Sequence, residues 1–473
     1  MAHRWQSRSP NSFLWPEPMS ASGTIAVLDI GKTNIKLVVF DRAGHVLWEK
    51  SQPNRPVQSG LYPHADVEKI WSFLLEALRE AASRFTLDVL IPATHGATGA
   101  LIDAYGLVLP VMDYEFAGLN DIEARYKAIR PDFSETFSPH LPTGLNLGRQ
   151  IAYQAWHYPQ LYAKATHFLT YPQYWGWRLT GALAADITSL GCHTDLWLPE
   201  AAKPSALSDA LDLTRKLPPL LPAWATLGSV LPDVAALAGV PQGMRVLCGI
   251  HDSNAALLPY LISRSTPFTV LSTGTWVIFM AVGHSLAHLN PHDDMMANID
   301  ANGRPTACAR FMGGREYAEI CGDCSAEPSL EQVQSLINAK TLALPSFSPH
   351  GGPFATLKGR IEGALQSEQR SSLATLYCAL MSDLILTRMG VDAGEIIIDG
   401  SFARNQLFCA LLAQLRPGQS LLRATDQAGT ARGAALLADW PHKEVQVGTQ
   451  TVTPATLAGL HNYALAWAAA LTL

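Results

Sequence analysis

Residues 245–256 read RVLCGIHDSNAA, and this stretch decides the predicted fold. An apolar run ends in a carboxylate, Asp252, and small residues that can begin a helix follow. A short apolar run bounded in this way predicts a buried strand. An acid at the carboxyl end of such a strand faces the crevice in which α/β proteins bind ligands. Asp252 is therefore the first candidate for a functional side chain, with a helix N-cap before residues 253–258 as the equal alternative.

A second apolar stretch follows about twenty residues later. Residues 268–271 and 276–282 are apolar, and Ser272-Thr273-Gly274-Thr275 separates them. This order predicts a strand, a polar glycine turn and a second strand.

The N-terminal part of the chain has the same design. Residues 24–28 are apolar and end at Asp29, the loop Ile30-Gly31-Lys32-Thr33-Asn34 follows, and residues 35–40 and 45–49 are again strand-like. In a Walker P-loop or a Rossmann fingerprint the glycine loop opens a helix. A strand follows here, so the sequence predicts a β-meander with a polar tip and excludes both of those motifs.

The remaining patterns alternate between helix and strand. We expect helices at 66–84, 151–179, 371–389, 407–415 and 429–437 and in the last 30 or so residues, strands at 89–91 and 395–400, and a loop at 201–222. Strands alternating with helices indicate an α/β fold. A chain of 473 residues is too long for one ordinary core, so two or more domains are expected.

Composition narrows the class of protein. The formal net charge of −6 gives no support to a nucleic-acid or acidic-membrane partner. No apolar run reaches the roughly 18 residues that a membrane span needs. Seven dispersed cysteines are typical of reduced thiols and a cytoplasmic protein. The first 23 residues contain no apolar signal region and predict a disordered tail, with Met19 as an alternative start.

One cysteine pair has the spacing of a metal ligand motif. Cys321-Gly322-Asp323-Cys324 is a lone C-x-x-C, and no second pair of ligands lies at a spacing suited to zinc. Two ordinary cysteines in a loop are the favoured interpretation.

Two glycine and threonine hairpin tips in similar halves predict a phosphate chain held between two domains. Backbone N–H groups and threonine hydroxyls bind phosphate oxygens, and glycine lets the backbone approach closely. Mg²⁺ takes one or two carboxylates in addition to phosphate oxygens, and Asp29 is placed to provide one. Asp252 would then accept the proton of an attacking hydroxyl. Each feature alone has an ordinary explanation: Gly and Thr are common in turns, and His95 and His251 are typical of partly buried histidines.

Taken together, these motifs resemble the FGGY family of carbohydrate kinases, within the actin-like ATPase superfamily. The resemblance covers about residues 24–438. It rests on DIGKTNIK at 29–36, GIHD at 249–252, TGTW at 273–276, IDGS at 398–401 with Asn405, and GAA at 433–435.

The resemblance implies two actin-like (ribonuclease H-like) α/β domains with a catalytic cleft between them. We expect a sugar-binding domain at 24–244 and an ATP-binding domain at 245–473. The resemblance implies ATP and Mg²⁺ as cofactors, Asp252 as the base and Asp29 as the metal ligand. The expected ATP and phosphate contacts are Gly31, Lys32, Thr33, Asn34, Thr273, Gly274, Thr275, Gly400, Ser401 and Asn405. The expected sugar contacts are Thr94, His95, Asp113, Tyr114, His251 and Asp252.

The sequence also departs from the family pattern. Lys32 stands where the family often has Thr or Ser, and it either reaches a phosphate or is solvated. VMDYE at 111–115 replaces the frequent Trp-x-Asp-x-Arg segment, which argues against a plain xylulose or glycerol pocket. The resemblance is nearer to the deoxy-ketohexose kinases for L-fuculose or L-rhamnulose.

The leading hypothesis is an ATP-dependent kinase for a hydroxyl of a ketose or deoxy-ketose. The alternatives are an inactive sugar sensor and an actin-like nucleotide switch. The sequence allows a homodimer without fixing the oligomeric state.

Overall fold

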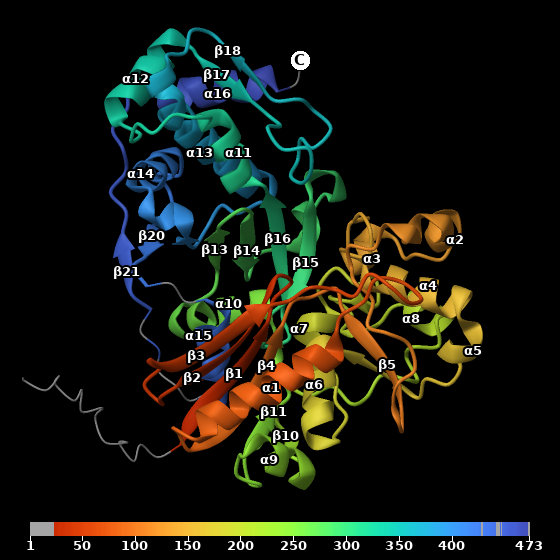
Figure 1. Ribbon diagram of the computed structural model, residues 1–473. Helices are drawn as coiled ribbons and strands as arrows, with labels where there is room; N and C mark the ends of the chain where they lie inside the picture. Colours follow the sequence, from red (N-terminus) through yellow and green to blue (C-terminus); the bar gives the residue numbers. More distant parts are fainter. Residues whose placement is uncertain (1–22, 427–428, 441–444, 446, 472–473) are drawn as a thin grey trace, which may run out of the picture.

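The computed structural model describes residues 23–426, 429–440, 445 and 447–471 (Figure 1). Figure 1 shows two lobes, each built around a twisted sheet, with a helical extension beside the first. The two-domain α/β class predicted from the sequence is confirmed. The tail predicted for residues 1–23 lies outside the described residues except for Gly23.

The first sheet has the strand order β10-β11-β4-β1-β2-β3, and β12 also pairs with β4. Its strands are β1 Thr24–Ile30, β2 Asn34–Phe40, β3 Val46–Pro53, β4 Leu87–Thr94, β10 Thr226–Ser229, β11 Arg245–Leu247 and β12 Ile250–His251. Strands β1, β2 and β3 form the predicted antiparallel meander, while β4 runs parallel to β1 and β11 parallel to β4.

The second sheet repeats this plan in the order β15-β16-β14-β13-β19-β20-β21. Its strands are β13 Phe268–Thr273, β14 Val277–Val282, β15 Met295–Ile299, β16 Pro305–Phe311, β19 Glu395–Gly400, β20 Leu421–Ala424 and β21 Thr449–Thr451. The meander is now β13, β14 and β16, and β19 and β20 continue it in parallel. The duplicated meander expected from the sequence is therefore present in both halves.

Helices cover both faces of each sheet. The main ones are α1 Val67–Ala82, α4 Leu147–His157, α6 Tyr171–Thr180, α7 Ile187–Leu190, α10 Asp252–Ser263, α11 Gly313–Cys321, α13 Arg370–Arg388, α14 Gln406–Leu415, α15 Thr430–Ala435 and α16 Leu460–Ala470. Successive residues of a strand point to opposite faces. Accordingly Ala26 and Leu28 pack with α1 and α6, while Ile25 and Val27 pack with α15.

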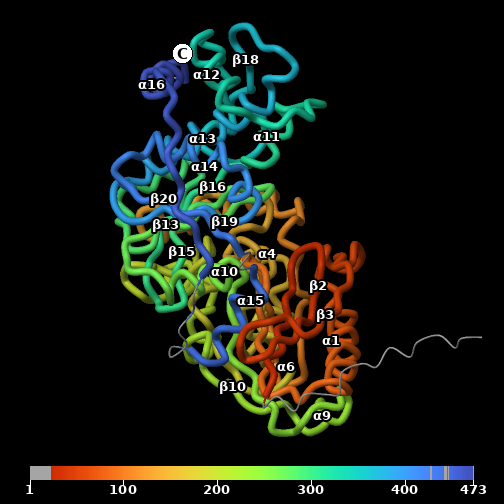
Figure 2. Tube along the Cα trace, turned by 90° about the vertical axis from the view of Figure 1, so that its left-hand side faces the viewer, coloured from red at the N-terminus to blue at the C-terminus, as the bar shows by residue number. Residues whose placement is uncertain are grey.

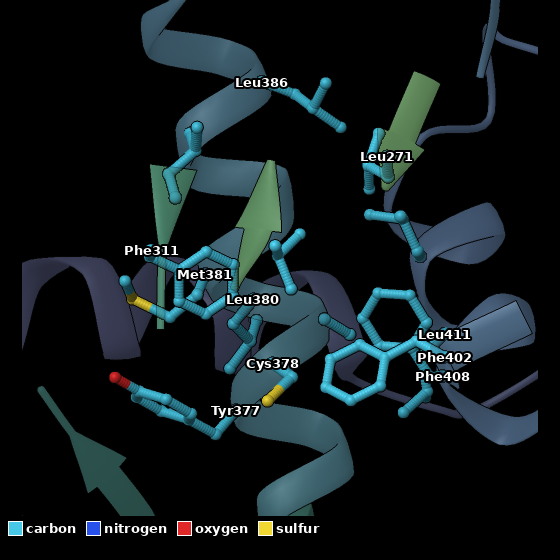
Figure 3. Packing of buried hydrophobic residues seen from close by; sticks show 14 of the residues in the cluster. Leu271, Phe311, Tyr377, Cys378, Leu380, Met381, Leu386, Phe402, Phe408 and Leu411 are labelled. Carbon is cyan, nitrogen blue, oxygen red and sulfur yellow. The ribbon is translucent and has the colours of Figure 1, made fainter. Parts of the chain in front are cut away.

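The largest core lies between the second sheet and helices α11, α13 and α14. Figure 3 shows part of this cluster, with Tyr377, Cys378 and Met381 on α13, Phe311 on β16, and Phe402, Phe408 and Leu411 to one side. Helix α13 is buried on most sides and forms the centre of the second lobe.

Helix α10 joins the two sheets. Its residues Ala255 and Leu258 belong to a core with the first sheet, and Leu257 and Tyr260 belong to a core with the second. Helix α15 packs against α10 so closely that a Cβ on Gly433 would lie 1.9 Å from the Ala255 carbonyl oxygen. Figure 2 shows α10 and α15 where the two lobes meet.

Some sequence-based boundaries differ from the structure. The stretch 151–179, predicted to be helical, contains the strand β7 His167–Thr170, which pairs with β5 Gly99–Asp103. Residues 245–246 and 250–251, which were expected to begin the second domain, pair with β4 in the first sheet. The terminal helix α16 spans only 460–470 and follows β21. Among the residues that the structure describes, none of the helices combines the length and apolarity of a membrane span.

Candidate active site

The carboxyl ends of three neighbouring strands define the centre of the site. The sheet register aligns Ile30 of β1 with Thr94 of β4, and Thr94 with His251 of β12. The residues that follow this row are Gly31, His95 and Asp252. Because the three strands are parallel and end together, the predicted hairpin, the predicted sugar segment and the predicted base meet at one edge of the sheet.

Asp252 is the first residue of α10, and it is not the N-cap. The N-cap position is His251, which makes no side-chain capping hydrogen bond. The Asp252 carboxylate accepts a hydrogen bond from the Ser253 backbone N–H at 2.6 Å, and its side chain is 29% exposed. A carboxylate at this position is stabilised by the helix dipole and stays accessible to a ligand. The prediction that Asp252 is a helix N-cap is therefore wrong, and its carboxylate is available for a functional role.

The His251 side chain lies beside this carboxylate. The His251 ring is buried, and its Nε2 lies 3.1 Å from the Asp252 Oδ1. Burial lowers the pKa of His251, while the Asp252 charge opposes that shift. The Asn254 side-chain amide lies 3.4 Å from His251 Nδ1, where it can donate to a ring nitrogen that carries no proton. Gly96 permits this packing, since a Cβ there would lie 2.7 Å from the His251 ring.

The backbone just before Asp252 is also held by residues of α7. The His251 backbone N–H donates to the Thr188 hydroxyl at 3.1 Å, and Thr188 in turn donates to Asp186. Asp186 is fully buried, and burial raises the pKa of its carboxyl to about 7. Sequence reasoning missed this support because residues 186–188 are remote in sequence from the strand they hold.

Asp29 lies at the end of β1, partly buried beside the same edge. Burial and, secondarily, the charge of Asp252 raise the pKa of Asp29 to about 6. Two carboxylates close enough to perturb each other are an arrangement that a divalent cation relieves. Among the described residues no group of three or more His, Cys, Asp or Glu side chains is placed to hold a metal. An Mg²⁺ that binds one or two carboxylates and the phosphates fits this site.

The first hairpin tip presents backbone and side-chain groups to solvent. Gly31 donates its N–H to the Asn34 carbonyl at 2.9 Å, and Thr33 and Asn34 are exposed. Asn54, which sequence reasoning did not select, braces the tip: its side chain donates to the Gly31 carbonyl and its N–H to the Thr33 carbonyl, each at 2.8 Å. The Lys32 side chain points away from the other side chains of the tip, toward Asp113 and Glu115.

Lys32 reaches the expected sugar side of the site. Its Nζ forms ion pairs with Asp113 and, at 3.2 Å, with Glu115, and it lies 4.5 Å from the centre of the Tyr114 ring. Tyr114 packs edge-on against His95, with 5.4 Å between ring centres. A small cavity is lined by Lys32, Asn54, Pro56, Ala65, His95, Thr98, Met112, Asp113 and Tyr114. The predicted residues His95, Asp113 and Tyr114 are thus together.

Burial shifts the pKa values of two side chains that line this cavity. Burial lowers the pKa of His95, so its ring is neutral at pH 7, and burial raises the pKa of Tyr114. Thr94 is different from its neighbours: it is fully buried and its hydroxyl donates to the His95 carbonyl at 3.1 Å. The Thr94 hydroxyl therefore stabilises the turn after β4 and is not exposed to a ligand.

The second hairpin is locked to the strand-to-helix turn at Gly400. The Thr273 hydroxyl donates to the Asp399 carbonyl and accepts from the Phe402 N–H at 2.9 Å. Gly400 has φ +87°, and a Cβ there would lie 2.0 Å from the Thr273 carbonyl oxygen. Gly274 donates its N–H to the Trp276 carbonyl at 2.8 Å, which shapes the tip.

A cavity of about 620 Å³ lies beside this turn. It is lined by Gly314, Tyr317, Glu327, Pro328, Ser401, Phe402, Arg404, Asn405, Gln406 and Leu407. Asn405 also caps α14, since its Oδ1 accepts from the Phe408 N–H at 3.0 Å. Gly314 was not selected from the sequence, although a double glycine directly after the strand-like stretch 305–311 is a signal that the sequence contains. A Cβ on Gly314 would lie 2.2 Å from the Gly274 carbonyl oxygen.

The fold and the geometry of this site resemble those of two-domain carbohydrate kinases, as comparisons with known proteins show. The model of the N-terminal domain of the FGGY family of carbohydrate kinases matches residues 149–259, and that of the carbohydrate kinase FGGY C-terminal domain matches residues 265–446. A carbohydrate kinase from Novosphingobium aromaticivorans is 32% identical, with 94% of this chain and 100% of that chain covered and a TM-score of 0.88. The chain belongs to the FGGY family.

Two curated relatives are more distant. The L-fuculokinase of Salmonella typhi is 28% identical over 265 residues, which are 54% of this chain and 56% of that protein. The xylulose kinase of Escherichia coli (strain K12) is 24% identical over 453 residues, 87% of this chain and 88% of that protein. The chain therefore matches only about half the length of the L-fuculokinase.

Proposed function

We propose that this protein transfers the γ-phosphoryl group of ATP to a hydroxyl of a ketose or deoxy-ketose. The observation that carries the proposal is the convergence of Asp252 and Asp29 at one sheet edge, next to the tip of the first glycine hairpin. The family membership supports a carbohydrate kinase, and the partial likeness to L-fuculokinase supports a deoxy-ketose as the substrate.

Asp252 is the proposed general base. As the sugar oxygen attacks the γ-phosphorus, its proton passes to the Asp252 carboxylate while the new O–P bond forms. The bond between the γ-phosphorus and the bridging oxygen breaks, and its electron pair stays on the β-phosphate of ADP. The Ser253 backbone N–H, which donates to Asp252 Oδ1 at 2.6 Å, holds the carboxylate in place, and the His251 ring lies beside it with Nε2 at 3.1 Å. General-base help of this kind is worth about 10²–10⁴-fold.

The phosphates are assigned to the two hairpins. The first contributes Gly31, Thr33 and Asn34, and the second contributes Thr273, Gly274 and Thr275. Mg²⁺, when bound through Asp29, would neutralise phosphate charge. The adenosine is assigned to the cavity at Gly400, Ser401 and Asn405, and to Gly314 and Tyr317 beside them.

We assign the two substrates to different domains, one for each sheet. We assign the sugar to the domain that contains the first sheet, residues 24–251, and ATP mainly to the domain that begins with β13 at Phe268. Helix α10 then links the two, because it carries the base and packs on both sheets. Closure of the lobes would exclude water, which otherwise competes with the sugar hydroxyl.

The carboxylates around the proposed sugar site favour an uncharged sugar over a sugar acid. Asp29, Asp252 and the pair Asp113 and Glu115 give four carboxylates, and Lys32 is the ammonium group that pairs with the last two. A substrate carboxylate would add a like charge to this set, which is unfavourable in a partly buried site.

A coupled assay of ADP release tests the proposal. The panel consists of neutral ketoses, deoxy-L-ketohexoses and matched sugar acids, each with MgATP. Turnover is expected with a neutral ketose or deoxy-ketose and not with the acids. Sugar binding by calorimetry without any turnover would favour an inactive sensor instead, and steady ATP hydrolysis without sugar would favour a nucleotide switch.

A further inference from the structure

Lys32 connects two parts of the site that are far apart in sequence. It is a residue of the first hairpin tip, whereas its partner Asp113 lies 81 positions later. The Lys32 side chain is 23% exposed and that of Asp113 is 7% exposed, so the pair is largely shielded from water. Shielded pairs with good geometry hold their partners in place far better than surface pairs do.

The contacts around Asp113 make it dependent on this lysine. The Asp113 carboxylate also accepts the Glu115 backbone N–H at 3.1 Å, and the Asp113 N–H donates to the Pro63 carbonyl at 2.9 Å. Lys32 is the cation that pairs with it among the described residues. Removing Lys32 would leave a nearly buried carboxylate without a counter-charge, and such a group reorients toward water.

Lys32 also fixes the residue between its two acidic partners. Its Nζ lies over the Tyr114 ring at 4.5 Å, and this ring contacts His95. A cation over an aromatic face adds attraction and restricts the ring. The Lys32 head group therefore holds the whole wall formed by residues 113–115.

We propose that Lys32 is a positioning residue of the acceptor pocket, acting through Asp113 and Tyr114, and that it is not a phosphate ligand. This inference rests on the proposed sugar kinase function. Lys32 ties the sugar wall to the phosphate hairpin, so that the two substrates share one support. Its loss weakens sugar recognition much more than ATP recognition.

The test separates the KM of the sugar from the KM of ATP in Lys32→Met. We expect the sugar KM to rise about 10- to 100-fold, because misplacement of a binding group by about 1 Å has effects of this size. The ATP KM should change less than about threefold. Lys32→Arg should recover most of the sugar affinity, since a guanidinium also bridges two carboxylates.

A charge relocation sharpens the test. Glu115 Oε2 lies 3.2 Å from Lys32 Nζ, so a lysine at position 115 brings an ammonium group to the same place. The double variant Lys32→Met with Glu115→Lys should lower the sugar KM back toward the wild-type value. The matched control is Lys50→Met, because Lys50 also bridges two carboxylates, Glu76 at 2.6 Å and Glu80 at 3.2 Å, outside the site.

A rise in the ATP KM of Lys32→Met with an unchanged sugar KM overturns the inference and makes Lys32 a phosphate ligand. Failure of the double variant to recover sugar affinity also counts against it. If the wild-type protein phosphorylates no sugar, the proposed function fails separately. Thermal unfolding then decides on Lys32: a double-mutant cycle of Lys32→Met and Asp113→Asn without coupling overturns the inference.

Discussion

Replacement of Asp252 by asparagine has two separable consequences. Asparagine keeps the shape of the side chain, and its Oδ1 still accepts the Ser253 N–H that Asp252 accepts at 2.6 Å. It cannot take a proton from a hydroxyl. Loss of a general base lowers kcat by about 10²–10⁴-fold, which equals about 2.7–5.4 kcal/mol at 1.36 kcal/mol per factor of ten.

The second consequence concerns Asp29. Burial and then the Asp252 charge raise the pKa of Asp29 to about 6, so Asp29 binds a proton as the pH falls through 6. A protonated carboxyl cannot hold Mg²⁺. The wild-type rate should therefore fall below about pH 6, and excess Mg²⁺ should move this limb to lower pH. Without the Asp252 charge the pKa of Asp29 falls, and the limb moves to lower pH in the variant as well.

The assay is ADP release from pH 5 to 8.5 at saturating sugar, with ADP affinity measured by calorimetry. ADP binding should be unchanged, because the cavity at Gly400 is lined by residues of the second lobe. Asp252→Glu serves as a control that retains a base. A variant within about tenfold of the wild-type kcat would refute the base assignment. An acid limb that stays in place would refute the coupling of the two carboxylates.

Three further predictions concern residues that support the site. Gly400→Ala should weaken ADP binding and lower the melting temperature. The new Cβ would lie 2.0 Å from the Thr273 carbonyl oxygen, and the φ of +87° is unfavourable for alanine. Unchanged ADP affinity by calorimetry would contradict this prediction. Gly433→Ala should destabilise the protein by about 1–3 kcal/mol in thermal unfolding, because the new methyl group would push α15 away from α10. The control is Gly418→Ala, which should be neutral because a Cβ at position 418 would have no atom within 4 Å. Asp186 has a folded-state pKa raised to about 7, so its protonated form contributes stability at low pH that is lost as the pH rises through 7. Relative to Asp186→Asn, the wild-type protein should lose about 3 kcal/mol between pH 5 and 8 in urea unfolding, and parallel pH profiles would disprove the assignment.

The sequence predicted the elements whose signals are local. The two meanders could be placed because an apolar run, a glycine tip and a second apolar run are contiguous in the chain. The observed bounds of β1, β2, β13 and β14 agree with those runs to within a few residues. Asp252 could be singled out for the same reason, since the change from an apolar run to an acid is visible in residues 246–252.

Elements that depend on distant pairing were misplaced. Strand β7 was predicted to be helical because its aromatic neighbours continue a helical pattern, and only its pairing with Gly99–Ile102 makes residues 167–170 a strand. Strand β11 was assigned to the second domain because it precedes Asp252. It joins the first sheet because Val246 pairs with Leu90 and Arg245 with Val89. Local propensity contains no information on either partner.

Lys32 shows where sequence reasoning about a site reaches its limit. A lysine at a glycine hairpin tip is equally compatible with a phosphate and with solvent, because both alternatives use only the local sequence. The decisive groups, Asp113 and Glu115, lie in a segment without regular strand or helix. That segment is held in place by Pro63 and Ala65, through hydrogen bonds to Asp113 and Val111. The direction of the Lys32 side chain is thus set by tertiary contacts, and the same contacts make residues 113–115 and the tip of the first hairpin one structural unit.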